Sequence, residues 1–221
     1  MKDRGAYQPT GVSASGRAYE KVFVKRAHKL LGLGYATLTP GHFACAEEED
    51  ISGELVHAVD TVLDQTNLPS WFRWFSVHEE SRVHDPARKG KKCRRLDIRI
   101  DCAETRPRPR MCFEAKRLGP NHGVSVYLGS EGLQRFLDGR YARNHMAAGM
   151  LGYVQAENPA VWASKIKEAM ANVATTVRPL KSSPWRSEAL VPELQFTYRS
   201  GHGRPGVGSP IEIFHTLLVF N

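Results

Sequence analysis

The chain has 221 residues, 41% of them hydrophobic and 24% charged, and a formal net charge of +8. This composition is that of an ordinary globular domain, and no apolar run approaches the roughly 20 residues needed to span a membrane. The N-terminal stretch lacks the apolar core of a secretory signal, so we expect a cytoplasmic protein with no membrane partner. The spacing of the four cysteines indicates thiols rather than disulfides or a zinc site.

The first part of the chain is predicted to be helical after a flexible start. Residues 1–16 are polar and rich in Gly and Ser, and we expect them to be loosely ordered. Apolar residues at helical spacing predict a helix over 17–31, which Gly32 and Gly34 should end. The same spacing predicts a second amphipathic helix over 47–63.

Three strands are predicted next, over 71–83, 94–102 and 111–116. The second strand alternates, so that Leu96, Ile98 and Ile100 share one face and Asp97 lies on the opposite face. The loop ETRPRPR that follows contains two prolines and cannot continue a ladder. Because this loop is short, we expect the second and third strands to pair.

The second half of the chain alternates helices and strands. Ser130 can cap a helix through Tyr141, and the outer face of that helix would carry Arg135, Arg140 and Arg143. A strand over 149–155, a helix over 159–173 and strands over 193–199 and 211–220 complete the chain. The order of these elements predicts an α/β fold with a mixed sheet.

The third strand carries charges that a buried strand does not need. Glu114 and Lys116 share a face, about 6.6 Å apart along the strand. If the second and third strands pair, Glu114 and Asp97 converge on one spot. Two carboxylates with open positions suit Mg²⁺, which keeps waters and takes further ligands from phosphate. Because a nearby lysine can orient or deprotonate a water, the set predicts phosphodiester hydrolysis.

Basic residues surround these acids in the sequence. Residues 88–117 contain twelve Lys and Arg against four acids, an excess equal to the whole net charge. Such a positive field favours polyanions, of which nucleic acid is the commonest. The residues we expect to contact the nucleic-acid backbone are Lys91, Lys92, Arg94, Arg95, Arg106 and Arg108. A solvated basic hairpin that only keeps the protein soluble is the alternative.

The segments RRLDIRI (94–100) and MCFEAKRL (111–118) resemble the core motif of the PD-(D/E)xK nuclease superfamily, although Leu96 stands where that motif often has proline. The resemblance covers about 47–174 within a single domain, 17–221. It implies a restriction-endonuclease-like αβββαβ core, with a mixed central sheet flanked by helices, to which this chain adds a C-terminal strand pair. It also implies Mg²⁺-dependent cleavage of DNA, less often RNA, with Mn²⁺ as a substitute.

The resemblance also assigns roles to residues. Asp97 and Glu114, with the backbone carbonyl of Ala115, would hold the metal, and Lys116 would position the nucleophilic water. We therefore expect an Mg²⁺-dependent endonuclease that binds DNA in preference to RNA. By analogy with relatives, it would act in bacterial antiviral defence or restriction, as a homodimer or in a larger defence complex.

The superfamily often adds a glutamate from its first helix. At 100° per residue, Glu48 falls in the middle of the apolar stripe that faces the sheet, and Glu54 lies on its flank. Glu48 is therefore the first choice and Glu54 the second. An acidic first turn that only complements the helix dipole is an equally good interpretation of these acids.

Other interpretations stay open at this level. The same fold and charge would suit a non-catalytic module that binds nucleic acid, or a structural subunit whose basic hairpin docks an acidic protein. Simpler interpretations are favoured for several side chains: a strand-end amide for Gln155, surface or core positions for His202 and His215, and core packing for Trp71, Trp74 and Trp162.

Overall fold

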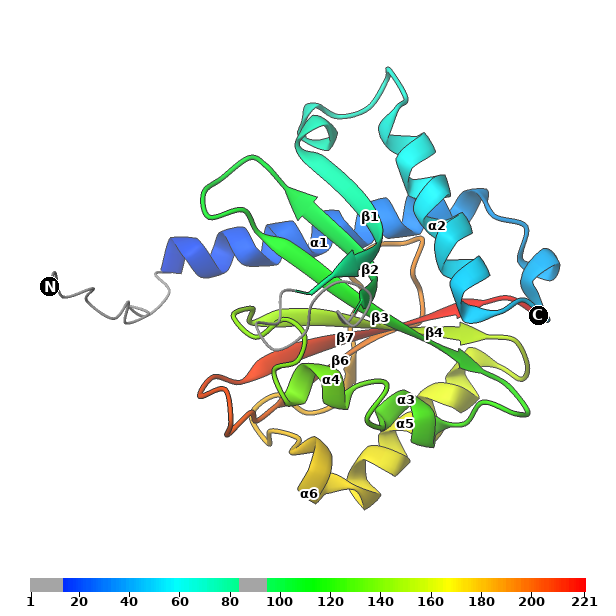
Figure 1. The fold of residues 1–221 in the computed structure, drawn as a ribbon, viewed down its shortest axis with the longest axis vertical. Helices are drawn as coiled ribbons and strands as arrows, with labels where there is room; N and C mark the ends of the chain where they lie inside the picture. The colour runs from blue at the N-terminus through cyan, green and yellow to red at the C-terminus, as the bar shows by residue number, and fades with distance from the viewer. Residues whose placement is uncertain (1–13, 84–94) are drawn as a thin grey trace, which may run out of the picture.

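The structure is a computed structural model that describes residues 14–83 and 95–221, the side chains of 14–19 excepted. Within these ranges a seven-stranded sheet lies between two layers of helices (Figure 1). The strands are β1 (Phe75–Arg82), β2 (Arg95–Cys102), β3 (Arg110–Leu118), β4 (Ala147–Val154), β5 (Arg186–Ser187), β6 (Thr197–His202) and β7 (Ile211–Val219). The flexible segment expected over 1–16 lies outside the described residues, except for 14–16, which begin the first helix.

The sheet is mixed, as the sequence predicts. Its strand order is β1-β2-β3-β4-β7-β6-β5. β1, β2 and β3 form an antiparallel meander, whereas β4 runs parallel to both of its neighbours, β3 and β7. β6 and β5 extend the sheet with antiparallel pairs. Parallel pairs need crossover connections, and these connections bring helices onto the faces of the sheet.

Helices cover both faces of the sheet. α1 (Ala14–Thr37) and α2 (Glu48–Leu63) lie on one face, and α3 (Val124–Leu128), α4 (Gln134–Leu137), α5 (Pro159–Asn172) and α6 (Ala174–Val177) lie on the other (Figure 1). The 3₁₀ turns η1 (Pro40–Phe43) and η2 (Ser70–Trp74) flank α2. Two clusters of buried apolar residues fill the two layers. Among the described residues, no helix is long and apolar enough to cross a membrane.

α2 is the helix that matters most for the site. Its apolar stripe is buried and consists of Ile51, Leu55, Val59 and Val62. Acids occupy its first turn, where the helix dipole favours negative charge. The Ser52 hydroxyl forms a buried hydrogen bond of 2.8 Å with the Tyr153 hydroxyl of β4. This bond fixes the N-terminal half of α2 over the sheet.

α1 is longer than predicted, because Gly32 and Gly34 lie inside it and do not end it. A Cβ at Gly34 would stand 2.5 Å from Val59 Cγ2 and 2.9 Å from the Val59 backbone nitrogen. The glycine therefore allows α1 and α2 to approach closely. In the sequence, a glycine that allows close packing, such as Gly34, looks the same as a glycine that ends a helix.

The helix predicted from Ser130 to Tyr141 is also wrong, since only the single turn of α4 is helical there. Gly132 packs so closely that an added Cβ would lie 2.2 Å from the Tyr127 carbonyl oxygen. Gly139 has φ +68°, which favours glycine and turns the chain away from the helix. Arg135 and Arg143 therefore do not share a helix face.

Two strands begin four residues later than predicted, while the bounds of the other predicted strands differ by one or two residues. β1 begins at Phe75 because the preceding residues, after Pro69, form the turn η2. β6 begins at Thr197 because the residues before it are held in a turn by the Leu194 carbonyl, which accepts a hydrogen bond from the Thr197 hydroxyl. The short edge strand β5 carries no alternating pattern and was not predicted.

β2 does not keep its three apolar side chains in one core. Ile98 and Ile100 are buried in the cluster beneath α1 and α2. Leu96 is buried in the cluster of the opposite layer. This difference from the predicted alternation arises where β2 separates from β3, beyond Ile98.

Candidate active site at the fork between β2 and β3

β2 and β3 pair over only part of their length. Their ladder ends with Ile98 opposite Phe113, so the next pair would be Asp97 opposite Glu114. There the two strands diverge, while β3 continues beside β4. The divergence forms a fork, and it leaves backbone N–H groups of β3 without a strand partner. Buried N–H groups need an acceptor from elsewhere.

Two carboxylates supply the missing acceptors. Asp97 Oδ2 accepts a hydrogen bond from the Ala115 backbone N–H at 2.6 Å. Glu48 Oε2, from the first turn of α2, accepts one from the Arg117 backbone N–H at 3.3 Å. Asp97 and Glu48 therefore lie side by side along one edge of β3, although they come from different elements.

Glu114 and Lys116 complete the set. Glu114 is fully buried, and the Lys116 side chain is 9% exposed. Lys116 Nζ lies 3.1 Å from Glu114 Oε1 and 2.5 Å from Glu48 Oε1. The structure thus brings together the four side chains selected from the sequence. Glu54, the second choice from the helix, is exposed and does not line the pocket at this site.

The loop before α2 is held in place by the residue that follows β4. Gln155 Nε2 donates to the carbonyl oxygens of Phe43 and Ala46, each at 2.8 Å. Arg117 Nη2 forms a 2.6 Å ion pair with Glu47, the residue immediately before α2. Gln155 is therefore more than a strand-end amide, because these contacts set where α2 begins and where Glu48 points.

A second cation reaches the fork from the opposite layer. Arg135 Nη1, on α4, donates to Glu114 Oε1 at 2.7 Å and to the Tyr141 hydroxyl at 2.9 Å. The Tyr141 hydroxyl in turn donates to the Arg95 carbonyl of β2 at 2.5 Å. The sequence predicts Arg135 on the outer face of a helix with two other arginines, either in contact with phosphates or solvated, whereas the structure places it against Glu114. Arg140 instead pairs with Asp138 at the surface.

Burial raises the pKa values of both acids on the two strands. The pKa of Asp97 rises to about 6 because of burial, although Lys116 and the Ala115 N–H oppose the rise. The pKa of Glu114 rises to about 8 because of burial and the neighbouring Asp97, against the effect of Lys116 and Arg135. With a pKa of about 8, Glu114 keeps its proton at neutral pH unless another cation joins the site.

Lys116 behaves in the opposite way. Burial alone would lower its pKa, but Glu114, Glu48 and Asp97 raise it above its ordinary value. Lys116 is therefore a permanent cation at neutral pH. The pKa of Arg135 is also raised: burial opposes the rise, and Glu114 and Glu131 cause it.

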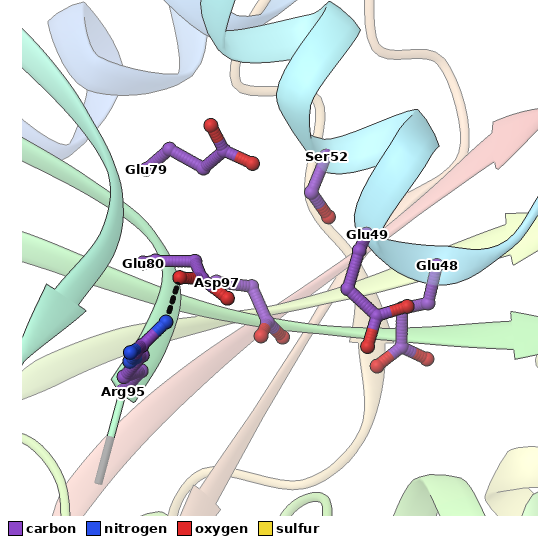
Figure 2. A pocket seen from close by; sticks show the side chains of 7 residues that line it. All are labelled: Glu48, Glu49, Ser52, Glu79, Glu80, Arg95 and Asp97. Carbon is purple, nitrogen blue, oxygen red and sulfur yellow. Dashed lines mark hydrogen bonds and ion pairs between the residues drawn. The ribbon is translucent and has the colours of Figure 1, made fainter. Parts of the chain in front are cut away.

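A small pocket of about 60 Å³ opens beside Asp97. Figure 2 shows Glu48 and Glu49 of α2 facing Asp97 of β2 across this pocket, with Glu79 and Glu80 of β1 on the same side as Asp97. Glu80 forms an ion pair with Arg95 and has a backbone φ of +43°, which is unusual for a non-glycine residue. The pocket wall is strongly acidic and repels anions, so a bound phosphate would need a cation here.

The residues present fit a hard divalent cation. Within 14–83 and 95–221 no group of three or more His, Cys, Asp or Glu side chains forms a metal site by itself. Mg²⁺ needs less than that, because it keeps several waters and is usually held by one or two carboxylates. Glu114 Oε2 is buried without a hydrogen-bond partner among the described residues. Such an orphaned carboxylate oxygen, next to a second acid, suits a metal ligand.

The predicted nucleic-acid contacts are only partly described. Lys91, Lys92 and Arg94 lie outside the described residues. Arg95 is paired with Glu80. Arg106 and Arg108 are exposed in the β2–β3 loop. This loop lies at the end of the hairpin away from the fork, about 17 Å along β2 from Asp97 at 3.3 Å per residue.

The aromatic and histidine residues weighed from the sequence lie mostly in the core. Trp162, His202 and His215 are buried. Trp71 packs on Phe72 and Phe75. Trp74 differs from the expectation, because it is 39% exposed and carries the Arg73 guanidinium over its ring.

The sequence does not predict Arg135 and Tyr141 as members of the site. In the sequence each belongs only to a helical stripe, which the structure replaces with turns.

Comparisons of the chain with protein-family models, with curated proteins and with solved structures find no match in any of the three. Functional assignment therefore rests on the chemistry of the site itself.

Proposed function

We propose that this chain is a metal-dependent nuclease of the restriction-endonuclease-like PD-(D/E)xK type, hydrolysing phosphodiester bonds of DNA in preference to RNA. One observation carries the proposal: Asp97, Glu114 and Lys116 meet where β2 and β3 part. The order of elements supports it. A helix, an antiparallel three-strand meander, a helical crossover and a parallel fourth strand agree with the αβββαβ core that the superfamily implies.

Asp97, Glu114 and the Ala115 carbonyl would hold Mg²⁺. The N–H and C=O groups of a strand residue point to the same edge. Because the Ala115 N–H faces Asp97, its carbonyl faces the fork as well. When bound, the ion would supply a Lewis acid that makes water a better nucleophile and offsets negative charge on the phosphate.

Lys116 orients the attacking water in this proposal. Its ammonium group has three donors, and Glu114 and Glu48 account for two of them. The third donor is left for a water or a phosphate oxygen. Because its pKa is raised, Lys116 acts as a fixed cation and does not abstract the proton. Glu48 holds the ammonium group in place.

The exposed arginines favour a polymeric substrate. Arg106 and Arg108 lie in the loop beyond the end of β2, which is about 17 Å along the strand from Asp97 and too far for a single nucleotide to bridge. At a rise of 3.4 Å per nucleotide along the axis of a DNA duplex, that distance corresponds to about five nucleotides. Contacts of this kind hold the phosphate backbone and carry no sequence information.

The test is cleavage of plasmid and single-stranded DNA by the purified protein with Mg²⁺, with Mn²⁺ or with EDTA. Asp97→Asn and Lys116→Met should each lower the rate about 100-fold or more. Glu54→Gln is the matched control, because it removes an exposed acid from the same helix as Glu48. It should cleave at the wild-type rate.

Two results would reject the nuclease. Salt-dependent DNA binding without cleavage, kept in both variants, would identify a non-catalytic nucleic-acid-binding module. No affinity for DNA or RNA at moderate salt would instead point to a structural subunit.

A further inference from the structure

The carboxylate of Glu114 is held from one side only. Its Oε1 atom accepts a hydrogen bond from Arg135 at 2.7 Å and lies 3.1 Å from the Lys116 ammonium. Its Oε2 atom is buried and has no partner among the described residues. Rotation of the carboxylate out of its present plane would break both cation contacts. The two cations therefore fix the orientation of the carboxylate and leave its second oxygen for a further ligand.

Arg135 is itself rigidly placed. Its guanidinium lies 5.3 Å from the centre of the Tyr141 ring, and its Nη1 donates to the Tyr141 hydroxyl. Its Nη2 pairs with Glu131, four residues earlier in the chain. Only the planar guanidinium fork can make these contacts together, because a lysine offers a single point charge.

The same unit reaches the other strand of the fork. The Tyr141 hydroxyl donates to the carbonyl of Arg95, two residues from Asp97 in β2. Arg135 and Tyr141 therefore connect Glu114 on β3 to the strand that carries Asp97. The separation between the two acids depends on this connection as well as on the strands.

We infer that Arg135, supported by Tyr141, is a positioning residue for the metal site, which holds Glu114 so that Oε2 faces the ion. This inference rests on the proposed function and adds a residue from the opposite helical layer to it. It makes a prediction that runs against simple electrostatics. Removing a nearby positive charge should strengthen cation binding by Coulomb's law, whereas losing the positioning of a ligand should weaken it.

The experiment is calorimetric titration of the full chain with MnCl₂ and with MgCl₂ in the absence of nucleic acid. Arg135→Gln and Arg135→Lys should both bind the metal about tenfold or more weakly than the wild type, as is typical when a ligand loses its supporting hydrogen bond. Tyr141→Phe, which removes one hydroxyl, should weaken binding in the same direction by a smaller factor. Arg143→Gln removes an exposed arginine nearby and should leave the affinity unchanged. Circular dichroism melts identify the variants that are folded.

The outcomes separate this inference from the proposed function. Weaker metal binding in folded Arg135→Lys, where the charge is kept, supports positioning. Unchanged or tighter binding in both Arg135 variants and in Tyr141→Phe, with metal binding by the wild type, overturns the inference and leaves the nuclease proposal standing. If the wild type binds no metal, both fail.

Discussion

Replacing Glu114 by Gln should change how the stability of the metal-free protein depends on pH. Burial and Asp97 raise the pKa of Glu114 from an ordinary 4.5 to about 8. The unfolded chain therefore releases this proton near pH 4.5, while the folded chain keeps it until near pH 8. Wild-type stability must fall as the pH rises through this window. At about 1.4 kcal/mol per pH unit, the loss is about 3 kcal/mol between pH 5 and 7.

The measurement is urea denaturation in EDTA between pH 5 and 8, for wild type and Glu114→Gln. Between pH 5 and 7, the free energy of unfolding of the variant should rise by about 3 kcal/mol relative to that of the wild type. The altered contacts to Lys116 and Arg135 shift the variant's free energy of unfolding by the same amount at every pH, so they do not change this pH dependence. For Glu54→Gln, on the surface of α2, the free energy of unfolding should change with pH as it does in the wild type. If the free energy of unfolding of Glu114→Gln also changed with pH as that of the wild type does, the idea that the buried Glu114 holds a proton would be refuted.

Three further predictions concern two residues of α1 and the glutamine that follows β4. His28 is buried and its pKa is lowered to about 4, so below pH 6.5 the wild type should lose about 1.4 kcal/mol per pH unit relative to His28→Phe. Equal slopes in urea titrations would contradict this. Gly34→Ala should cost about 1–3 kcal/mol in thermal melts, because its Cβ would overlap α2, while Gly41→Ala enters open space and should be nearly neutral. Gln155→Ala should lower the free energy of unfolding by about 1–3 kcal/mol through two lost hydrogen bonds. It should also speed amide exchange over residues 43–48; unchanged exchange there would mean that the Gln155 contacts do not hold the loop.

The sequence carries enough information to bring the acids of the two strands together. Strand alternation and a short loop placed Asp97 near Glu114, and the structure has them at the end of the shared ladder. Helical periodicity directed Glu48 towards the sheet, and it meets Lys116 there. Both inferences use local geometry, in which the period of one element decides the direction of a side chain.

The residues that were misread depend on contacts between distant elements. Arg135 reaches Glu114 only because Gly132 and Gly139 turn the chain, and a helical period cannot reveal that. Gly34 resembles a helix stop in the sequence, and only the backbone of α2 beside it explains the glycine. Such packing relations leave no periodic pattern, since each involves segments far apart along the chain.

The fork has a consequence for the cooperativity of folding. Where β2 leaves β3, the N–H groups of Ala115 and Arg117 find their acceptors in Asp97 of β2 and Glu48 of α2. Ala115 is fully buried, so its N–H group has no water to replace a missing carboxylate. The backbone of β3 is therefore satisfied only when α2 and β2 are both in place. Asp97→Asn keeps an acceptor for Ala115, whereas Asp97→Ala leaves a buried donor without a partner and should cost about 1–3 kcal/mol of stability.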